Sequence, residues 1–204
     1  MNGGYDAGYQ ACPCFWGDEP GSLLTRLVSR VADVASLRAF DAGCGEGKNA
    51  FYLASRGASV VAVDLSPWAI MNGRARHGDV PGIKWIVGDV GALRLPVGEY
   101  HVVVAYGLLH CLPDPAAVRD LVDRLMQATR PGGYQIVCAF NARFQDLRAH
   151  LDFSPTLLSH ADILSLYDGW DVVEASDRDL VETHPHNNIQ HTHSMTRLIA
   201  RKPA

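Results

Sequence analysis

The stretch that decides the fold is Asp41-Ala42-Gly43-Cys44-Gly45-Glu46-Gly47, a glycine-rich turn between two regular elements. Residues 38–41 predict a short strand before it, and residues 48–55 predict a helix after it that ends near Gly57. Glycine has no Cβ atom, so the turn allows a ligand to approach the backbone closely. A glycine-rich turn that follows a strand and opens a helix is typical of a nucleotide-type cofactor site.

Strands and helices alternate along the chain on both sides of this turn. Apolar patterns predict strands at residues 59–64, 84–87, 101–106 and 134–140, and helices at residues 22–34, 67–75 and 116–129. After a helical segment near residues 161–166, two more strands are expected near 171–175 and 194–201, with no helix between them. The sequence therefore predicts an α/β fold with a doubly wound, mainly parallel sheet and an antiparallel pair at one edge.

Composition limits the class of protein and its partners. The 204 residues are 48% apolar and 20% charged, which fits one domain over residues 1–204, with residues 1–21 as an N-terminal arm or lid. The net charge of -4 and the lack of a long basic run argue against nucleic acid or an anionic membrane as partner. The sequence has no signal-peptide pattern and no apolar run long enough to span a bilayer, so we expect a cytoplasmic protein.

Acidic residues follow three successive predicted strands. Asp41 and Glu46 at the turn would repel a pyrophosphate but favour a cationic ligand, such as the aminopropyl and sulfonium portion of S-adenosylmethionine (SAM). Opposite unit charges 4 Å apart attract by about 4 kcal/mol at an effective dielectric constant near 20. Asp64 ends the next strand and suits the ribose hydroxyls of a nucleotide, while Asp89 and Val90 follow the third strand and suit an adenine. A single acidic residue after a strand is more often a turn or helix cap. Acidic residues after three successive strands predict a cofactor site.

With these motifs in place, the sequence resembles the class I SAM-dependent methyltransferases. The matching segments, within residues 23–140, are Phe40 to Gly47, Val61 to Ser66, Gly88-Asp89-Val90, and Arg130-Pro131-Gly132-Gly133-Tyr134. The resemblance implies a Rossmann-like sheet of seven strands, with SAM as cofactor and S-adenosylhomocysteine as product. It also implies a set of cofactor-binding residues: Asp41, Gly43, Gly45, Asn49, Asp64, Leu65, Asp89, Val90 and Tyr106.

Within that class, the chain is similar to the small tellurite-resistance (TehB-like) methyltransferases. The similar stretches are Cys44 to Asn49, Tyr167-Asp168-Gly169-Trp170 and Ile199-Ala200-Arg201-Lys202. This resemblance implies a compact enzyme that acts on a small nucleophile as a monomer or homodimer. The chain differs from that group in its histidine-rich C-terminal region and in the Cys-Pro-Cys-Phe-Trp segment of its arm.

Four of the nine histidines lie within residues 184–194, as His184, His186, His191 and His193. In an extended chain residues i and i+2 share a face, so the four imidazoles are expected on one face of a hairpin that turns at Asn187-Asn188. They have three interpretations: substrate-pocket residues that act as general base or hydrogen-bond donors, ligands of a transition metal, or a solvated loop.

We favour the first interpretation and assign no metal ligand, because the TehB-like resemblance implies a histidine from this region at the active site. His184 is the first candidate for the base, and His110, which follows the fourth expected strand, is a further candidate. The predicted function is SAM-dependent methyl transfer to a small molecule.

Three rival functions remain open at this level. The first is a methyltransferase-fold protein with a metal-dependent or non-methylating reaction at the histidines. The second is an NAD-dependent oxidoreductase, against which the acids of the turn argue. The third is a non-enzymatic nucleotide-binding regulator, which has no need of the imidazoles.

Overall fold

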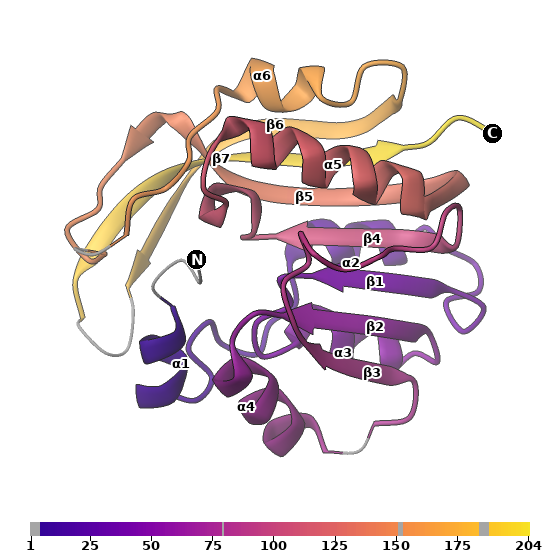
Figure 1. Cartoon of the computed structure of the whole chain (residues 1–204), viewed down its shortest axis with the longest axis horizontal. Helices are drawn as coiled ribbons and strands as arrows, with labels where there is room; N and C mark the ends of the chain where they lie inside the picture. Colours follow the sequence, from indigo (N-terminus) through magenta and orange to yellow (C-terminus); the bar gives the residue numbers. More distant parts are fainter. Residues whose placement is uncertain (1–4, 79, 151–152, 184–187) are drawn as a thin grey trace.

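Seven strands form one sheet in the computed structural model, which describes residues 5–78, 80–150, 153–183 and 188–204. The strand order is β3-β2-β1-β4-β5-β7-β6 (Figure 1). The strands are β1 (Arg38–Ala42), β2 (Ser59–Asp64), β3 (Ile83–Val87), β4 (Tyr100–Tyr106), β5 (Thr129–Gln145), β6 (Asp171–Thr183) and β7 (Gln190–Arg201).

Strands β1 to β5 are parallel, and β7 runs antiparallel to both β5 and β6. The predicted α/β class and the antiparallel pair at one edge are therefore confirmed. The order reverses between β1 and β4, which both start their crossovers from the centre of the sheet. In open α/β sheets ligands bind at such a reversal, beyond the carboxyl ends of the strands.

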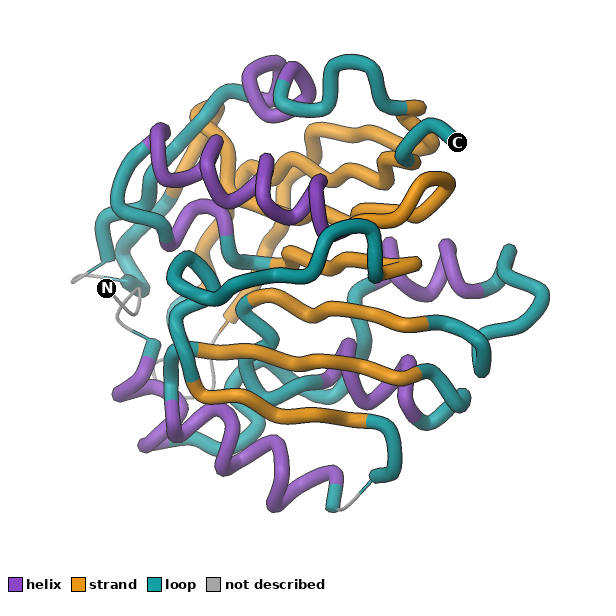
Figure 2. The backbone as a smooth tube through the Cα atoms, turned by 45° about the vertical axis from the view of Figure 1, so that its right-hand side comes forward, coloured by secondary structure: helices purple, strands orange, loops and turns teal. Residues whose placement is uncertain are grey.

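Helices cover both faces of the sheet (Figures 1 and 2). One face packs against α2 (Ser22–Val28), α3 (Lys48–Ala54) and α4 (Pro67–His77), and the other against α5 (Pro115–Ala128) and α6 (His160–Ser165). Adjacent residues of β5 alternate between the two cores, since Ile136 belongs to the first and Val137 to the second. Burial on both faces explains why the inner strands read as continuous apolar runs. No helix in the described ranges is long and apolar enough to cross a membrane.

Several elements differ from the sequence-based expectation. The helix expected at residues 22–34 ends at Val28, and the strand expected at residues 134–140 is longer, as β5. The arm contains a short helix, α1 (Asp6–Ala11), for which no helix was predicted. Strands β6 and β7 are longer than expected and form a hairpin that extends beyond the rest of the sheet (Figure 1). Most of β6 is exposed, because it is an edge strand that pairs only with β7. Such a strand needs few apolar side chains, so its hydrophobic period is weak in the sequence.

Three glycines shape the turn between β1 and α3. Gly43, Gly45 and Gly47 have φ angles of 65°, 55° and 79°, in the left-handed region that other residues adopt at a cost. A Cβ atom at Gly47 would also overlap the ring of Trp85 in β3. The turn therefore depends on glycine both for its backbone conformation and for the close packing of β3 beside it.

Replacing Gly47 by alanine should destabilise the fold more than the same change at Gly98. Gly98 has a similar φ of 63° but no neighbour within 4 Å of an added Cβ. Gly98→Ala should lower the free energy of unfolding by about 1–2 kcal/mol for the left-handed backbone alone. Gly47→Ala should lower it by a further 1–3 kcal/mol or so for overpacking against Trp85. Urea unfolding of both variants tests this, and equal losses would contradict the packing argument.

Candidate functional site

A cavity of about 530 Å³ lies at the carboxyl ends of the central strands. The turns after β1 to β4 line it, together with the arm and the inward-facing residues of the β6–β7 hairpin. Its volume falls in the range of about 300–1,000 Å³ that is usual for small-molecule sites. The cavity therefore lies where the strand order predicts a ligand.

Most of the residues predicted to bind the cofactor meet at this cavity. Those that line it are Gly43, Gly45, Asn49, Asp64, Leu65, Asp89, Val90 and Tyr106. Asp41 does not line it but lies beneath the glycine turn with 1% of its surface exposed. The sequence motifs are thus one site in space, although they span residues 41 to 106.

The Asp64 carboxylate joins the turns after β1 and β2. One oxygen accepts a hydrogen bond from the Gly45 N–H at 2.7 Å, and the other accepts one from the Ser66 N–H at 2.9 Å. Burial raises the pKa of Asp64, and these two backbone hydrogen bonds oppose the rise. Each oxygen keeps a further lone pair for a ligand in the cavity.

Asp41 is an unusual carboxyl group. Burial, with a smaller contribution from the charge of Asp64, raises the pKa of Asp41 to about 7. Among the described residues no group hydrogen-bonds to its Oδ2 atom. A buried carboxyl with this pKa ionises readily when a positive charge arrives nearby.

Glu46 anchors the N-terminal arm instead of facing the cavity with free oxygens. Its Oε1 atom accepts hydrogen bonds from the Cys14 N–H at 2.7 Å and from Asn72 Nδ2 at 3.0 Å. Its Oε2 atom accepts one from the Phe15 N–H at 2.8 Å. The sequence pattern paired Glu46 with a cationic ligand, but its hydrogen bonds bind the arm to the glycine turn.

The arm forms one wall of the cavity. Tyr9 and Phe15 pack on Ala69 of α4, and Trp16 donates a hydrogen bond to the Tyr9 hydroxyl at 3.0 Å. Lys48, at the start of α3, donates to the carbonyl oxygen of Trp16 at 2.8 Å. The arm aromatics thus pack against the domain beside the predicted cofactor residues.

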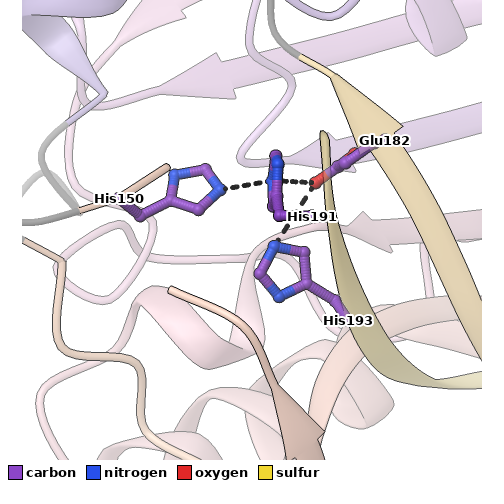
Figure 3. Close-up of side chains that lie close together, drawn as sticks. All are labelled: His150, Glu182, His191 and His193. Carbon is purple, nitrogen blue, oxygen red and sulfur yellow. Dashed lines mark hydrogen bonds and ion pairs between the residues drawn. The ribbon is translucent and has the colours of Figure 1, made fainter. Parts of the chain in front are cut away.

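The predicted histidines separate into three groups. His184 and His186 lie outside the described residues. His191 and His193 are buried on β7, where they meet His150 and Glu182 (Figure 3). Sequence reasoning missed His150 and Glu182, because only the pairing of β6 with β7 and the path of the chain after β5 bring them to the other two.

His110 lines the cavity as a neutral imidazole. Burial lowers the pKa of His110 to about 3, and its ring stacks on Phe140 with centroids 4.0 Å apart. The Nδ1 atom accepts a hydrogen bond from the Phe140 N–H at 3.1 Å. In the neutral ring the proton is then on Nε2, so His110 is suited to donate a hydrogen bond rather than to act as a base.

Arg197 provides a positive charge on the side of the cavity nearest β7. Its Nη2 atom donates to the Ser22 hydroxyl at 2.5 Å. Its Nε–H is buried and has no acceptor in the part of the chain that the structure describes. Tyr106, Phe140 and Met195 line the cavity with it, so this side combines apolar surface with one buried donor.

Comparisons with known proteins agree with this geometry. Residues 39–133 match the family model of a methyltransferase domain. A TehB structure from Haemophilus influenzae superposes with a TM-score of 0.74 at 19% identity, covering 89% of this chain and 62% of that one. Residues 39–133, slightly less than half of the chain, are thus similar to a methyltransferase domain, and the chain has the fold of the TehB structure.

Curated proteins that match this chain in sequence differ in name. A probable phthiotriol/phenolphthiotriol dimycocerosates methyltransferase 2 of Mycobacterium ulcerans is 33% identical over 57% of this chain and 46% of its own length. A ubiquinone biosynthesis O-methyltransferase of Acinetobacter baumannii is 30% identical over 58% and 50%. The chain thus spans about half the length of these curated relatives.

One solved structure matches along the whole chain. It is described as "Conversion of a Disulfide Bond into a Thioacetal Group during Echinomycin Biosynthesis". It is 25% identical, covers 100% of this chain and 92% of that one, and superposes with a TM-score of 0.75.

Stability of the fold should decrease as the pH rises through the range in which Asp41 titrates. Below about pH 4 the carboxyl is protonated in both the folded and the unfolded chain. Between about pH 4 and pH 7 the folded chain keeps the proton and the unfolded chain loses it, so the free energy of unfolding decreases by about 4 kcal/mol in all. Asp41→Asn lacks this dependence. Urea unfolding of both proteins across the range measures it, and a constant difference between them would contradict it.

Weakening the Glu46 contacts should release the arm. Glu46→Gln places an amide where the carboxylate accepts hydrogen bonds from Cys14 and Phe15, at an expected cost of about 1.5–3 kcal/mol. Cleavage by a protease within residues 5–21 should therefore become faster by about tenfold or more. Glu19→Gln, an exposed change in the same arm, is the matched control. Equal cleavage of the two variants would show that Glu46 does not hold the arm.

Proposed function

We propose that this chain transfers the methyl group of SAM to a small-molecule nucleophile and releases S-adenosylhomocysteine. One observation carries the proposal. Asp64 and Asp89, at the carboxyl ends of neighbouring parallel strands, line the cavity where the strand order reverses, and the buried Asp41 lies at the end of β1 beside the glycine turn.

The two sides of the cavity suit the two parts of such a reaction. On the cofactor side, Asp64 accepts from the ribose hydroxyls, and Asp89 and Val90 hold the adenine. Gly43 and Gly45 give the methionine portion access to the backbone, with Asn49, Leu65 and Tyr106 around it. The buried Asp41 ionises as the sulfonium binds. Its pKa of about 7 supports this role, because little free energy is needed to ionise it near neutral pH.

The acceptor occupies the side lined by His110, Arg197 and the β6–β7 hairpin. The nucleophile forms a bond to the methyl carbon as the bond from that carbon to sulfur breaks. The sulfonium is already activated, so the protein contributes mainly alignment and exclusion of water. His110 donates a hydrogen bond to the acceptor through Nε2, and the Arg197 guanidinium binds an anionic or carbonyl group of it.

A base is required only when the acceptor arrives protonated. By sequence position His184 stays the first candidate, with His186 as an alternative. His191 and His193 border the acceptor side behind Glu182, whose carboxylate lines the cavity. His191 and His193 thus border the acceptor side of the proposed site.

The names of the relatives favour a small-molecule acceptor but do not agree on which of its atoms receives the methyl group. The Acinetobacter relative is named as an O-methyltransferase of ubiquinone biosynthesis. The structure that matches along the whole chain is described by a reaction at sulfur. A search for the acceptor should therefore include hydroxyl compounds and thiols, with amines and chalcogen oxyanions as further classes.

Binding and turnover measured on the same protein test the proposal. Calorimetry should show one SAM bound per chain, and SAM labelled in its methyl group should transfer label to at least one class of acceptor. Asp64→Asn should weaken SAM binding by about 10–100-fold, because it removes a charged acceptor of the ribose hydroxyls. Asp168→Asn, an exposed acid after α6, is the control and should bind SAM like the original chain.

Two outcomes would contradict the proposal. Absence of SAM binding would remove the cofactor assignment. SAM binding without label transfer to any acceptor class would favour a methyltransferase-fold protein that carries out another reaction.

A further inference from the structure

Four side chains converge beside the acceptor side of the cavity (Figure 3). His150 lies in the segment after β5, Glu182 lies near the end of β6, and His191 and His193 lie near the start of β7. One nitrogen or oxygen atom from each lies within 4.8 Å of those of the other three. None of the four is among the residues proposed to bind SAM.

The pairing of β6 with β7 creates most of this cluster. Glu182 is directly opposite His191, and Leu180 is directly opposite His193. Leu180 and Glu182 are two residues apart, share a face of β6 and both line the cavity. The two imidazoles therefore lie on the same face of the hairpin as the Glu182 carboxylate, and His150 approaches them from the segment after β5.

Hydrogen bonds at the far side of two rings fix which nitrogen faces the cluster. The Nδ1 atom of His191 lies 2.8 Å from the Ile189 carbonyl oxygen, which only accepts. The Nδ1 atom of His193 lies 2.7 Å from Gln145 Oε1. Gln145 is itself oriented, because its Nε2 atom donates to the carbonyl oxygens of Asn141 at 2.8 Å and Ser194 at 2.9 Å. Both imidazoles thus carry a proton on Nδ1 and turn the Nε2 lone pair inward, as metal-binding histidines do.

The spacing of the inward atoms fits one small cation. His191 Nε2 lies 3.1 Å from His150 Nε2 and 3.5 Å from Glu182 Oε1, and His193 Nε2 lies 3.6 Å from the same Glu182 oxygen. Ligands about 2.0–2.1 Å from a tetrahedral zinc ion are about 3.3 Å from one another. We propose that His150, Glu182, His191 and His193 form a binding site for a divalent transition-metal cation of the zinc class.

The donor set and its surroundings select this class of cation. Three imidazoles and one carboxylate suit Zn²⁺ and related transition metals, whereas Mg²⁺ and Ca²⁺ prefer oxygen ligands. The side chains of His191 and His193 are 0% exposed, and that of Glu182 is 18% exposed. Phe140 stacks on His193 with centroids 4.0 Å apart, and Phe153 packs beside His150. Such an apolar shell strengthens the attraction between the ligands and a cation.

The cation would join the β6–β7 hairpin to the segment after β5, which lies about 30 residues earlier in the sequence. Four protein ligands complete a tetrahedral shell, which is the arrangement of a structural zinc site. The site would hold the end of the β6–β7 hairpin against the segment after β5. Glu182 would be both a ligand of the cation and part of the cavity wall. This inference goes beyond methyl transfer and does not depend on it.

Metal binding by the full chain, without SAM or acceptor, tests the proposal. The protein is first freed of metal by dialysis against a chelator, and Zn²⁺ is then added in a calorimeter. One Zn²⁺ should bind per chain with a Kd below about 1 µM, and Mg²⁺ should not compete. Co²⁺ should replace Zn²⁺ and give the intense visible absorption of a tetrahedral site.

Single variants assign the binding to these residues. His193→Ala and Glu182→Gln should each weaken Zn²⁺ binding by about 100-fold or more, and Gln145→Ala by about 10–100-fold, because Gln145 only orients His193. His101→Ala is the matched control, since it removes an imidazole at the far end of β4, where Nδ1 accepts from the Arg38 N–H. Intact SAM binding by each variant shows that it folds.

Two results would overturn the proposal. One is the lack of stoichiometric Zn²⁺ binding by the original chain. The other is Zn²⁺ binding that Glu182→Gln and Gln145→Ala leave unchanged. Neither result bears on methyl transfer, because SAM binding and turnover are measured separately.

Discussion

The Asp64 carboxylate fixes the geometry on which the candidate site depends. It accepts hydrogen bonds from the backbone of Gly45 and of Ser66, and so ties the turn after β1 to the turn after β2. The three glycines allow the first turn to adopt left-handed backbone angles. The hydrogen bond from Gly45 to the Asp64 carboxylate then stabilises the conformation that the structure shows. The same group faces the cavity, so one residue both builds the turn and meets the ligand.

Segments distant in the sequence complete the cavity around this fixed centre. Glu46 attaches the arm to the glycine turn, and the arm aromatics pack on α4. On the other side, the long β6–β7 hairpin brings Glu182 and Arg197 to the cavity wall. The strand-end motifs and the arm beside them thus define the proposed cofactor side, while the β6–β7 hairpin defines much of the proposed acceptor side.

Sequence patterns predicted the centre of the molecule better than its ends. The parallel strands are apolar because both faces are buried, and acids at their carboxyl ends meet at one edge, so the mainly parallel sheet and most of the cavity residues followed from local patterns. The sequence pattern did not predict that Glu46 also binds the arm, because these hydrogen-bond partners lie 31 and 32 residues away. Glu182 was missed because cross-strand pairing brings it to His191, and His150 was missed because only the path of the chain after β5 brings it to the same place. The exposed length of β6 also left too weak a period to predict the full hairpin.

The most direct test of the central claim is an experimental structure of the full chain with S-adenosylhomocysteine bound. The account predicts the ribose hydroxyls on Asp64, the adenine beside Asp89 and Val90, and the sulfur facing the side that contains His110 and Arg197. A nucleoside bound elsewhere, or one whose sulfur faces away from that side, would contradict it.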